Sequence, residues 1–511
     1  EYPRLAHVGD RTGLELIRTL QQKIVSMQQE DFVQHGDYEA NLKVFAECTI
    51  TDLLTDAGAV SGAFGYWRET GRFIRFDAPA VVLATGGIGK AFKVTSNSWE
   101  YTGDGHALAL RCGAKLINME FIQFHPTAMV WPTSVKGILV TESVRGDGGV
   151  LRNSEDKRFM FDYVPAVFAD QYATSEAEAD RWYDDPDHNR RPPELLPRDE
   201  VARAINSEVK AGRGSPHGGV FLDVSTRLPA EVIMKRLPSM YHQFKELADV
   251  DITAEPMEVG PTCHYVMGGV EVDPDTAAAS VRGLFAAGEV AGGMHGSNRL
   301  GGNSLSDLLV FGRRAGLGAA TYVDSLGGRR PSVHEAEVTA AARRAISPFH
   351  AGTDSVDAEN PYSLQHELQQ TMNDLVGIIR GAAEMELALK QLRELRRRAE
   401  HIVVEGHRQF NPGWHLALDL RNMLVVSECV ARAALERTES RGGHTRDDYP
   451  VMDPQWRHAL LVCTRHTDGA QGSVRVERQE QIPMRVDLVE LFERDELAKY
   501  FTTEELPGGT D

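Results

Sequence analysis

The chain has 511 residues, of which 42% are hydrophobic and 25% are charged, a balance typical of a soluble globular protein with several domains. The formal net charge of −19 argues against a nucleic-acid ligand, and no apolar stretch reaches the roughly 20 residues that a membrane-spanning helix needs. Five cysteines lie far apart without a CxxC pair, which excludes a metal or iron–sulfur site built on local cysteine spacing and indicates a reducing compartment.

The first region, residues 1–116, combines a helical start with β-rich sequence. The segment "GDRTGLELIRTLQQKIVSMQ" predicts a helix, and residues 42–87 predict strands broken by Asp-Ala-Gly and Glu-Thr-Gly turns. The last of these strands, residues 81–85, runs into Gly86 and Gly87. A buried strand that ends in glycines is where a doubly wound α/β sheet meets its ligand.

A second strand of this kind is predicted at residues 284–287, in "GLFAAGE". Two such units, separated by sequence of another character, predict one α/β domain in two parts, 1–116 and 266–356. The insertion between them, 117–265, contains a polar, Pro-rich surface segment, "RWYDDPDHNRRPPELLPRD".

The last two regions are helical and mixed. Residues 357–440 contain long amphipathic runs that predict a helical domain. Residues 441–511 predict a small C-terminal domain or tail with strands. Its acidic end, "VDLVELFERDELAKYFTTEELPGGTD", suggests no chemistry.

A glycine-rich stretch, "GGMHGSNRLGGNSLSDLLVFGR", follows the second strand and places a histidine and an arginine before a helical run. We expect Asn303 or Ser304 to cap this helix, with Leu305, Leu308 and Leu309 on one face. The glycines let backbone approach a ligand closely, and a helix N-terminus suits an anion. The alternative is a tight turn between buried elements.

Several polar side chains occur in other turns shaped by glycine or proline. They are His125, Thr141, Glu142, Arg145, Arg198 and His264. Taken singly, each could be a cap, a structural histidine or a surface ion pair, and we expect Glu142 to pair with Arg145 three residues later. Together with Arg299 they predict a compact site for two carboxylates, because the arginine fork binds a carboxylate through two hydrogen bonds.

The ordered motifs carry a resemblance to a known family. The segments "ATGG", "TGDG", "QFHPT", "VTE", "RGDGG", "RD", "PTCHYVMGG", "GLFAAGE", "HGSNRLGGNSLSDLLVFGR" and "ESRGGHTRDDYP" run through nearly the whole chain. In this order they resemble the flavoprotein subunit of succinate dehydrogenase and fumarate reductase. The resemblance implies an α/β, doubly wound FAD-binding domain whose N-terminal part is missing from this sequence, an α+β capping domain, a helical domain and a small C-terminal tail.

The resemblance also implies roles for individual residues. FAD would contact Gly86, Gly87, Asp104, Glu289, Asn303, Ser304 and Leu305. The dicarboxylate would be held by His125, Thr141, His264 and Arg299, with His295 in the segment that runs past the flavin. Arg198 would accept the substrate proton, with Glu142 and Arg145 as its path, and no metal takes part. The partial positive charge at the start of the helix after Asn303 would stabilise negative charge on the reduced flavin.

By the same resemblance the protein is a succinate dehydrogenase of respiratory complex II that oxidises succinate to fumarate. Iron–sulfur clusters would lie only in a partner subunit, which is joined to a membrane anchor. We expect no nucleic acid and no direct membrane insertion, and a peripheral location on the cytoplasmic face of the cell membrane, or on the matrix side of the inner mitochondrial membrane in a eukaryote. The segment Arg441–Pro450 is the candidate contact with the partner, as a basic, glycine-hinged loop.

The sequence departs from the family at two points, and alternatives stay open. The N-terminal GxGxxG and the segment with the flavin-linked histidine are absent, so covalent attachment of FAD is left open. The spacing from His125 to Thr141 is longer than in better-known members, so the cap is expected to differ there. The alternatives are a fumarate reductase working in reverse, an L-aspartate oxidase, and a non-catalytic flavin-binding subunit. "PTCHYVMGG" favours the dehydrogenase, and intact Arg198, His264 and Arg299 argue against a non-catalytic protein.

Overall fold

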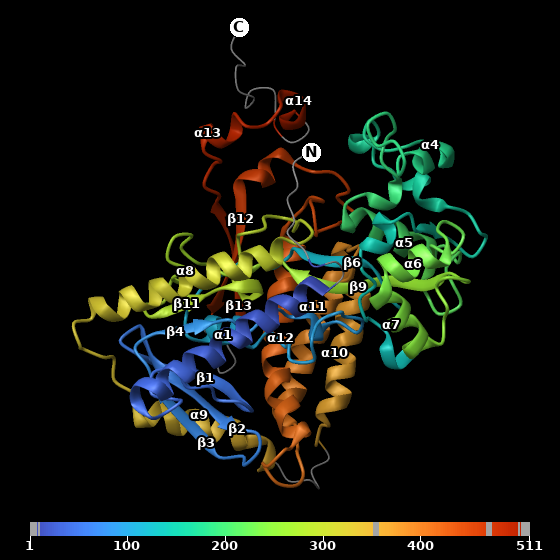
Figure 1. Ribbon diagram of the computed structural model, residues 1–511. Helices are drawn as coiled ribbons and strands as arrows, with labels where there is room; N and C mark the ends of the chain where they lie inside the picture. Colours follow the sequence, from blue (N-terminus) through green and yellow to red (C-terminus); the bar gives the residue numbers. More distant parts are fainter. Residues whose placement is uncertain (1–7, 9–10, 351–356, 467–472, 499–500, 502–511) are drawn as a thin grey trace.

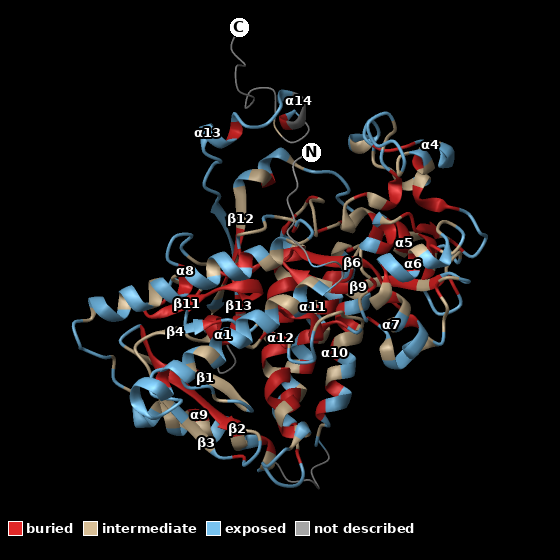
Figure 2. Ribbon diagram, in the orientation of Figure 1, coloured by how far each residue is buried: buried red, intermediate tan, exposed pale blue. Residues whose placement is uncertain are grey.

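The computed structural model describes residues 8, 11–350, 357–466, 473–498 and 501. Figure 1 shows a three-stranded sheet at the lower left, a bundle of long helices at the lower centre, a separate α+β lobe at the right and the C-terminal segment above. Buried residues concentrate where these parts meet (Figure 2). The predicted fold class is confirmed, whereas the exact domain boundaries stay predictions.

Two short parallel strands join the two parts of the α/β domain. β4 (Val81–Leu83) pairs with β11 (Leu284–Ala286), with Leu284 opposite Val81. Each strand is followed by a glycine in the left-handed region, Gly86 with φ 73° and Gly288 with φ 74°. The predicted pairing of two strand-then-glycine units is therefore present, although both strands are one or two residues shorter than expected.

The first region also forms the predicted helix and antiparallel sheet. The helix is α1 (Thr12–His35), and the sheet has the order β1 (Cys48–Asp56), β2 (Ala59–Trp67), β3 (Phe73–Asp77). Both connections turn at glycines with positive φ, Gly58 and Gly71, as the sequence predicts. Helix α9 (Glu335–Ile346) packs on β1.

The insertion folds as an α+β lobe with its own hydrophobic core. Its sheet has the strand order β6–β9–β8–β7, all antiparallel: β6 (Ile122–Met129), β9 (Met257–Val266), β8 (Val220–Asp223) and β7 (Val150–Arg152). Helix α5 (Arg198–Lys210) packs on β6 and β9 through its apolar face, where Val201 and Ile205 are fully buried. The lobe also contains α3 (Ser143–Gly146), α4 (Glu176–Arg181), α6 (Ala230–Arg236) and α7 (Pro238–Ala248).

The helical region is a bundle of α10 (Pro361–Leu375), α11 (Ala382–Arg398) and α12 (Pro412–Glu436). Most of α12 is buried, and it packs against α2 (Asp104–Arg111) of the first domain. The C-terminal strands β12 (Ala459–His466) and β13 (Ser473–Glu480) extend a sheet of order β10–β5–β12–β13. Because β5 (Leu116–Ile117) and β10 (Gly269–Val270) belong to the α/β domain, the C-terminal region is joined to that domain by a shared sheet. Two short helices follow, α13 (Val486–Val489) and α14 (Arg494–Leu497), and residues 502–511 of the acidic end lie outside the described residues.

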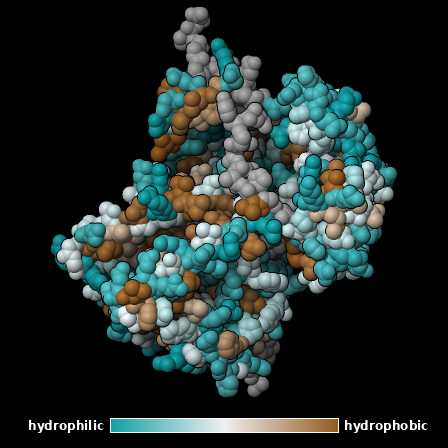
Figure 3. Space-filling view, viewed as in Figure 1, coloured by the Kyte–Doolittle hydropathy of each residue, from teal (hydrophilic) through white to brown (hydrophobic). Residues whose placement is uncertain are grey.

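Helix α8 (Asn303–Ser325) differs from the prediction at its start. Its N-cap is Gly302, with φ 81° and no side-chain cap, so neither Asn303 nor Ser304 caps it. Leu308 and Leu309 are about half exposed, and Figure 3 shows an apolar patch over the N-terminal half of this helix. Among the described residues, no helix combines the length and apolar character needed to cross a membrane.

Candidate active site

Two cap strands bring the two predicted histidines together. His125 on β6 and His264 on β9 have ring centroids 5.3 Å apart, in an edge-to-face arrangement. The Nδ1 of His125 lies 2.9 Å from the Thr127 carbonyl oxygen, and the Nδ1 of His264 lies 2.8 Å from the Ser96 hydroxyl. The remaining Nε2 atom of each ring is therefore the one available to a ligand.

Both imidazoles are neutral at ordinary pH. Burial, followed by the positive charges of Arg299 and Arg198, lowers the pKa of His264 to about 3. Burial, followed by Arg198, also holds the pKa of His125 well below its usual value. A neutral histidine in such a positive environment can donate a hydrogen bond to a carboxylate without serving as a permanent charge.

Arg198 forms an ion pair with Glu142, and this corrects one prediction. Arg198 is the first residue of α5, and its Nη2 and Nε lie 2.8 and 2.9 Å from the Glu142 Oε2. We expected Glu142 to pair with Arg145, but Arg145 donates from Nη1 to the Glu194 carbonyl oxygen. Burial raises the pKa of Glu142, and the charges of Arg145 and Arg198 outweigh this and hold it below its usual value. The error has a geometric reason, since Glu142 precedes the one-turn helix α3 and turns toward the neighbouring helix α5.

Arg145 itself is fully buried with unused donors. Its Nε and Nη2 atoms have no hydrogen-bond partner among the described residues. Burial lowers the pKa of this guanidinium, while the negative charge of Glu142 opposes the shift. Buried donors without partners are rare in folded proteins, so these nitrogens indicate a ligand or water in the site.

Arg299 lies in the glycine-rich stretch and is only 4% exposed. Its Nη2 donates to Gln123 Oε1 at 2.9 Å, and its guanidinium stacks 4.5 Å from the Tyr265 ring centre. Its Nε atom has no partner among the described residues. Burial and then the nearby charge of Arg198 lower the pKa of Arg299 to about 10, so it stays charged at neutral pH.

A chain of hydrogen bonds through the side-chain amides of Gln123 and Asn298, which the sequence did not reveal, holds Arg299 in place. Gln123 Nε2 donates to the Arg299 carbonyl oxygen at 2.8 Å and to Asn298 Oδ1 at 2.7 Å. Asn298 in turn donates to Asp199 Oδ1 at 2.8 Å. Burial raises the pKa of Asp199 to about 6. All three side chains lie inside the ordered motifs of the sequence, so their signal was present, but amides rarely suggest a role on their own.

The remaining substrate candidates lie at the edge of this group. Thr141 is next to Glu142, and its hydroxyl bonds the Ser143 hydroxyl at 3.3 Å. The segment between His125 and Thr141 folds back on itself, since Met129 N donates to Ile138 O at 2.8 Å. His295 lies 3.2 Å from the Tyr265 hydroxyl, through Nε2.

The glycine-rich stretch passes directly over the Arg198–Glu142 pair. A Cβ atom on Gly301 would lie 3.2 Å from Arg198 Nη2, so even a methyl group here would shift the guanidinium slightly. Gly293, Gly296 and Gly302 have positive φ, so the stretch combines this close approach with tight turns.

The segment Arg441–Pro450 contacts the glycine-rich stretch at Ser297. Gly443 N donates to the Ser297 carbonyl oxygen at 2.8 Å, and a Cβ on Gly442 would lie 2.4 Å from the same oxygen. Two of its arginines are held by protein partners, and the predicted contact with a partner subunit stays a prediction. Arg441 bonds Glu439, and Arg446 is 1% exposed and forms a bidentate pair with Asp448.

Comparison with protein families and solved structures identifies relatives of this chain. The FAD binding domain family matches residues 3–305, and the fumarate reductase flavoprotein C-terminal family matches residues 365–495. The chain is 40% identical to a subunit of the fumarate reductase (CoM/CoB) of Methanothermobacter marburgensis, over 90% of this chain and 75% of that protein. It is 35% identical to the succinate dehydrogenase flavoprotein subunit of Coxiella burnetii, over 91% and 73%. The structure of Mycobacterium smegmatis Sdh1 in complex with UQ1 superposes with a TM-score of 0.85 at 67% identity, over 99% of this chain and 79% of that one.

The chain belongs to the succinate dehydrogenase/fumarate reductase flavoprotein family. It is therefore an FAD-dependent oxidoreductase, and the recognition made from its motifs is confirmed.

Two of the residues predicted to hold FAD, Gly87 and Glu289, lie against each other. Glu289 is buried and accepts a hydrogen bond from Val266 N at 3.0 Å, and burial raises its pKa to about 8. A Cβ on Gly87 would lie 2.2 Å from Glu289 Oε1, so glycine keeps this carboxyl accessible. Such a buried carboxyl fits a partner with hydroxyl groups, as the sugar part of FAD has.

The other predicted FAD contacts border the same place. Gly103, which precedes α2, donates to the Gly87 carbonyl oxygen at 3.2 Å, and this sets Asp104 next to Gly87. The start of α8 is linked to the substrate group through Ser304, whose hydroxyl lies 3.4 Å from Arg299 Nη1. The donors and acceptors present fit a flavin between Glu289 and Arg299.

Proposed function

We propose that this chain is the flavoprotein subunit of a succinate dehydrogenase and oxidises succinate to fumarate. One observation carries the proposal: buried Arg299 and Arg145 have unused nitrogen atoms beside Arg198, His125 and His264. We call these five residues the substrate cluster. The charge of Arg198 lowers the pKa values of Arg299 and both histidines, so Arg198 is a near neighbour of all three.

The substrate cluster suits a dicarboxylate. One carboxylate would take a hydrogen bond from Arg299, whose charge and fixed guanidinium plane favour bidentate binding. Neutral His264, whose Nδ1 can accept from the Ser96 hydroxyl, would donate to the second carboxylate through Nε2. His125 would donate from Nε2 in the tautomer whose Nδ1 accepts from Thr127 N at 3.3 Å. Holding both ends of the substrate fixes the two methylene carbons, and this positioning accounts for much of the rate.

Arg198 is the residue proposed to take the substrate proton. Because the guanidinium already carries its proton, Arg198 can take the substrate proton only as one of its own N–H protons passes to the paired Glu142. The charge of Arg145 keeps Glu142 ionised and ready to accept that proton. When bound, FAD supplies the hydride acceptor for this oxidation. Gly301 allows Arg198 to approach the substrate from the cap side.

The partners are proposed from the family. The electrons would pass to a separate iron–sulfur protein and then to a membrane anchor, which would hold this chain on the cytoplasmic face of the membrane. The reverse reaction, fumarate reduction, uses the same residues, and the relatives carry both names. Extraction of the tagged full-length protein in mild detergent should co-purify a cysteine-rich subunit, and its recovery alone and active with oxygen would contradict this assembly.

The test is the flavin absorbance of the full-length protein while succinate, fumarate and aspartate are added in turn. Bleaching by succinate, followed by recovery of the oxidised spectrum with fumarate, is the expected result. Bleaching by aspartate with formation of iminoaspartate would favour L-aspartate oxidase instead. A flavin that responds to none of these would indicate a non-catalytic subunit.

A further inference from the structure

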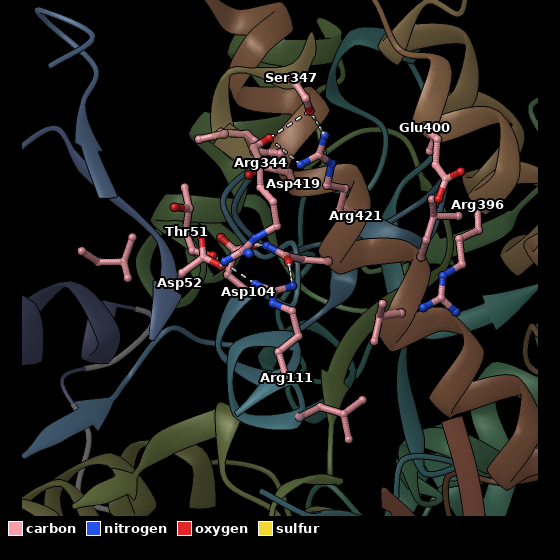
Figure 4. A pocket seen from close by; sticks show the side chains of 18 of the residues that line it. Thr51, Asp52, Asp104, Arg111, Arg344, Ser347, Arg396, Glu400, Asp419 and Arg421 are labelled. Carbon is pink, nitrogen blue, oxygen red and sulfur yellow. Dashed lines mark hydrogen bonds and ion pairs between the residues drawn. The ribbon is translucent and has the colours of Figure 1, made fainter. Parts of the chain in front are cut away.

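A cavity lined by arginines and apolar side chains, none of them in the substrate cluster, lies beside α12. It has a volume of 610 Å³ and is lined by residues of β1, α2, α9, α11, α12 and the strands β12 and β13. Ligand-binding cavities in proteins have this size. Figure 4 shows Arg111, Arg344 and Arg421 gathered between β1 and α12.

The lining of the cavity carries an excess of positive charge. Its basic residues are Arg111, Arg343, Arg344, Arg396, Arg421 and Arg465, and its acidic residues are Asp52, Asp104, Glu400 and Asp419. Two of these carboxyls ionise less readily than usual. Burial raises the pKa of Asp104, and burial together with the charge of Asp104 raises that of Asp419 well above its usual value.

Several of the guanidiniums bond neutral oxygen atoms. Arg421 donates to the Arg344 carbonyl oxygen and to the Ser347 hydroxyl, both at 2.8 Å. Arg465 donates to the Arg111 carbonyl oxygen at 3.0 Å, whereas Arg344 pairs with Asp52 at 2.8 Å. Burial, and then repulsion from Arg111, lowers the pKa of Arg421. Such a group of charges is stabilised by an anion bound among them.

The rest of the lining is apolar. Ile50, Leu110, Leu418 and Val425 lie beside the arginines, so a ligand would need an apolar body as well as a charged head. We propose that this cavity is a regulatory site for an organic polyanion, with phosphate or carboxylate groups on the arginines and its apolar part against these side chains.

A short chain of hydrogen bonds connects the cavity with the predicted flavin site. Arg111 Nη1 donates to Asn422 Oδ1 at 2.5 Å, and Asn422 Nδ2 donates to Asp104 Oδ1 at 2.6 Å. An anion that draws Arg111 away from Asn422 frees this amide to move, and Asp104 at the start of α2 moves with it. The bound anion therefore alters the environment of the flavin. This coupling rests on the proposed position of Asp104 next to FAD, whereas binding of the anion does not.

Binding is tested by calorimetry on the full-length, FAD-loaded protein with saturating fumarate in the substrate site. The probes are ATP, inorganic pyrophosphate and citrate, with adenosine as an uncharged control. We expect ATP or citrate to bind with one site per chain, and the better of the two distinguishes phosphate from carboxylate recognition. Arg344→Gln and Arg421→Gln should weaken this binding about 10- to 100-fold, the loss of one charge-assisted hydrogen bond.

The matched control is Arg397→Gln, which follows Arg396 on α11 but is exposed and paired with Glu394 outside the cavity. It should bind the probe like the wild type. No binding of any probe, equal binding by Arg421→Gln, or displacement of the probe by fumarate would each overturn the proposal. Failure here with an intact response of the flavin to succinate leaves the proposed function standing.

The coupling is tested separately with Asn422→Leu. The wild type should show a shift in flavin absorbance when the probe binds, and the variant should bind the probe without that shift. A full shift in Asn422→Leu would show that the proposed chain of hydrogen bonds is wrong.

Discussion

Two groups of buried arginines in this protein differ in how their nitrogens are used. In the substrate cluster, Arg145 and Arg299 are 0% and 4% exposed, and Arg145 keeps two nitrogen atoms and Arg299 one without a partner among the described residues. The second group consists of Arg446, within the segment Arg441–Pro450, and Arg437, which precedes that segment. They are 1% and 2% exposed, and every guanidinium nitrogen of both donates to a protein oxygen. We call these last two residues the loop cluster.

This difference distinguishes arginines that can bind a ligand from arginines that stabilise the fold. A buried donor left unsatisfied costs about 1–3 kcal/mol, so a protein keeps several only where something else pairs with them. Arg380, also buried, leaves one nitrogen without a partner among the described residues, so a single unpaired atom does not mark a site. What marks the substrate cluster is that the charge of Arg198 acts on both arginines with unused donors and on both neutral histidines.

The largest effect is expected from Arg198→Gln. Dye-linked succinate oxidation should fall by about 10²–10⁴-fold, because loss of a proton-transfer group costs this much when no other group can replace it. FAD content and dicarboxylate affinity should stay close to the wild-type values. Near-normal turnover with an artificial electron acceptor would remove Arg198 from the mechanism.

In the loop cluster, replacing an arginine should lower the stability of the fold. Arg446→Met leaves Asp448 and the carbonyl oxygens of Ala434, Leu435 and Arg437 without their donor. The free energy of unfolding should fall by about 3 kcal/mol, while activity per folded, FAD-loaded molecule is retained.

The control for Arg446→Met is Arg432→Met. It removes a partly exposed pair with Glu428 four residues earlier and should cost under about 1 kcal/mol. Urea unfolding of both variants measures the difference. Equal stabilities would mean that the loop cluster supports the fold far less than its hydrogen bonds indicate.

Arg299→Ala should weaken binding of succinate and of competitive dicarboxylates by about 10- to 100-fold, as a buried carboxylate loses a charged partner. His264→Ala should act in the same direction. Arg313→Ala, an exposed position on α8, is the control and should bind normally. Inhibitor titrations that are unchanged in Arg299→Ala and His264→Ala would place the carboxylate site elsewhere.

The smallest effect concerns the pH dependence of the FAD-free protein. Because burial raises the pKa of Glu289 from 4.5 to about 8, its contribution to stability is complete below about pH 4.5 and is lost as the pH rises through 8. Glu289→Gln should remove this loss, with a slope difference of at most about 1.4 kcal/mol per pH unit between pH 5 and 8. Urea unfolding at several pH values measures this difference. If Glu289 were ionised in the fold, the free energy of unfolding would depend on pH in the same way in the wild type and in Glu289→Gln. Exposed Glu231→Gln is the control.

The sequence predicted the framework of the fold and the charged members of the site. The paired strands before Gly86 and Gly288, the strands of the first region and the presence of an insertion follow from local turn chemistry and periodicity. The α+β character of the insertion and the role of Arg198 came from the resemblance of the ordered motifs, and the role of Arg198 stays a prediction.

The errors share a physical cause, which is that tertiary contacts decide where a side chain points. Glu142 pairs with Arg198 on another helix and not with its neighbour Arg145, and no spacing rule shows this. Arg446 was expected at the surface because arginine usually is, yet Asp448 and three carbonyl oxygens pair with it in the interior. Gln123 and Asn298 were overlooked because neutral amides have no pattern of their own.

The most direct test is a structure of the full-length, FAD-loaded protein with fumarate bound. The account predicts fumarate in the substrate cluster, with carboxylate oxygens within hydrogen-bond distance, about 3 Å, of nitrogens of Arg299 and of at least one histidine. Arg198 should face the two central carbons, and Arg437 and Arg446 should keep their protein partners. Fumarate bound elsewhere, or held without Arg299 and with Arg198 turned away, would contradict the account.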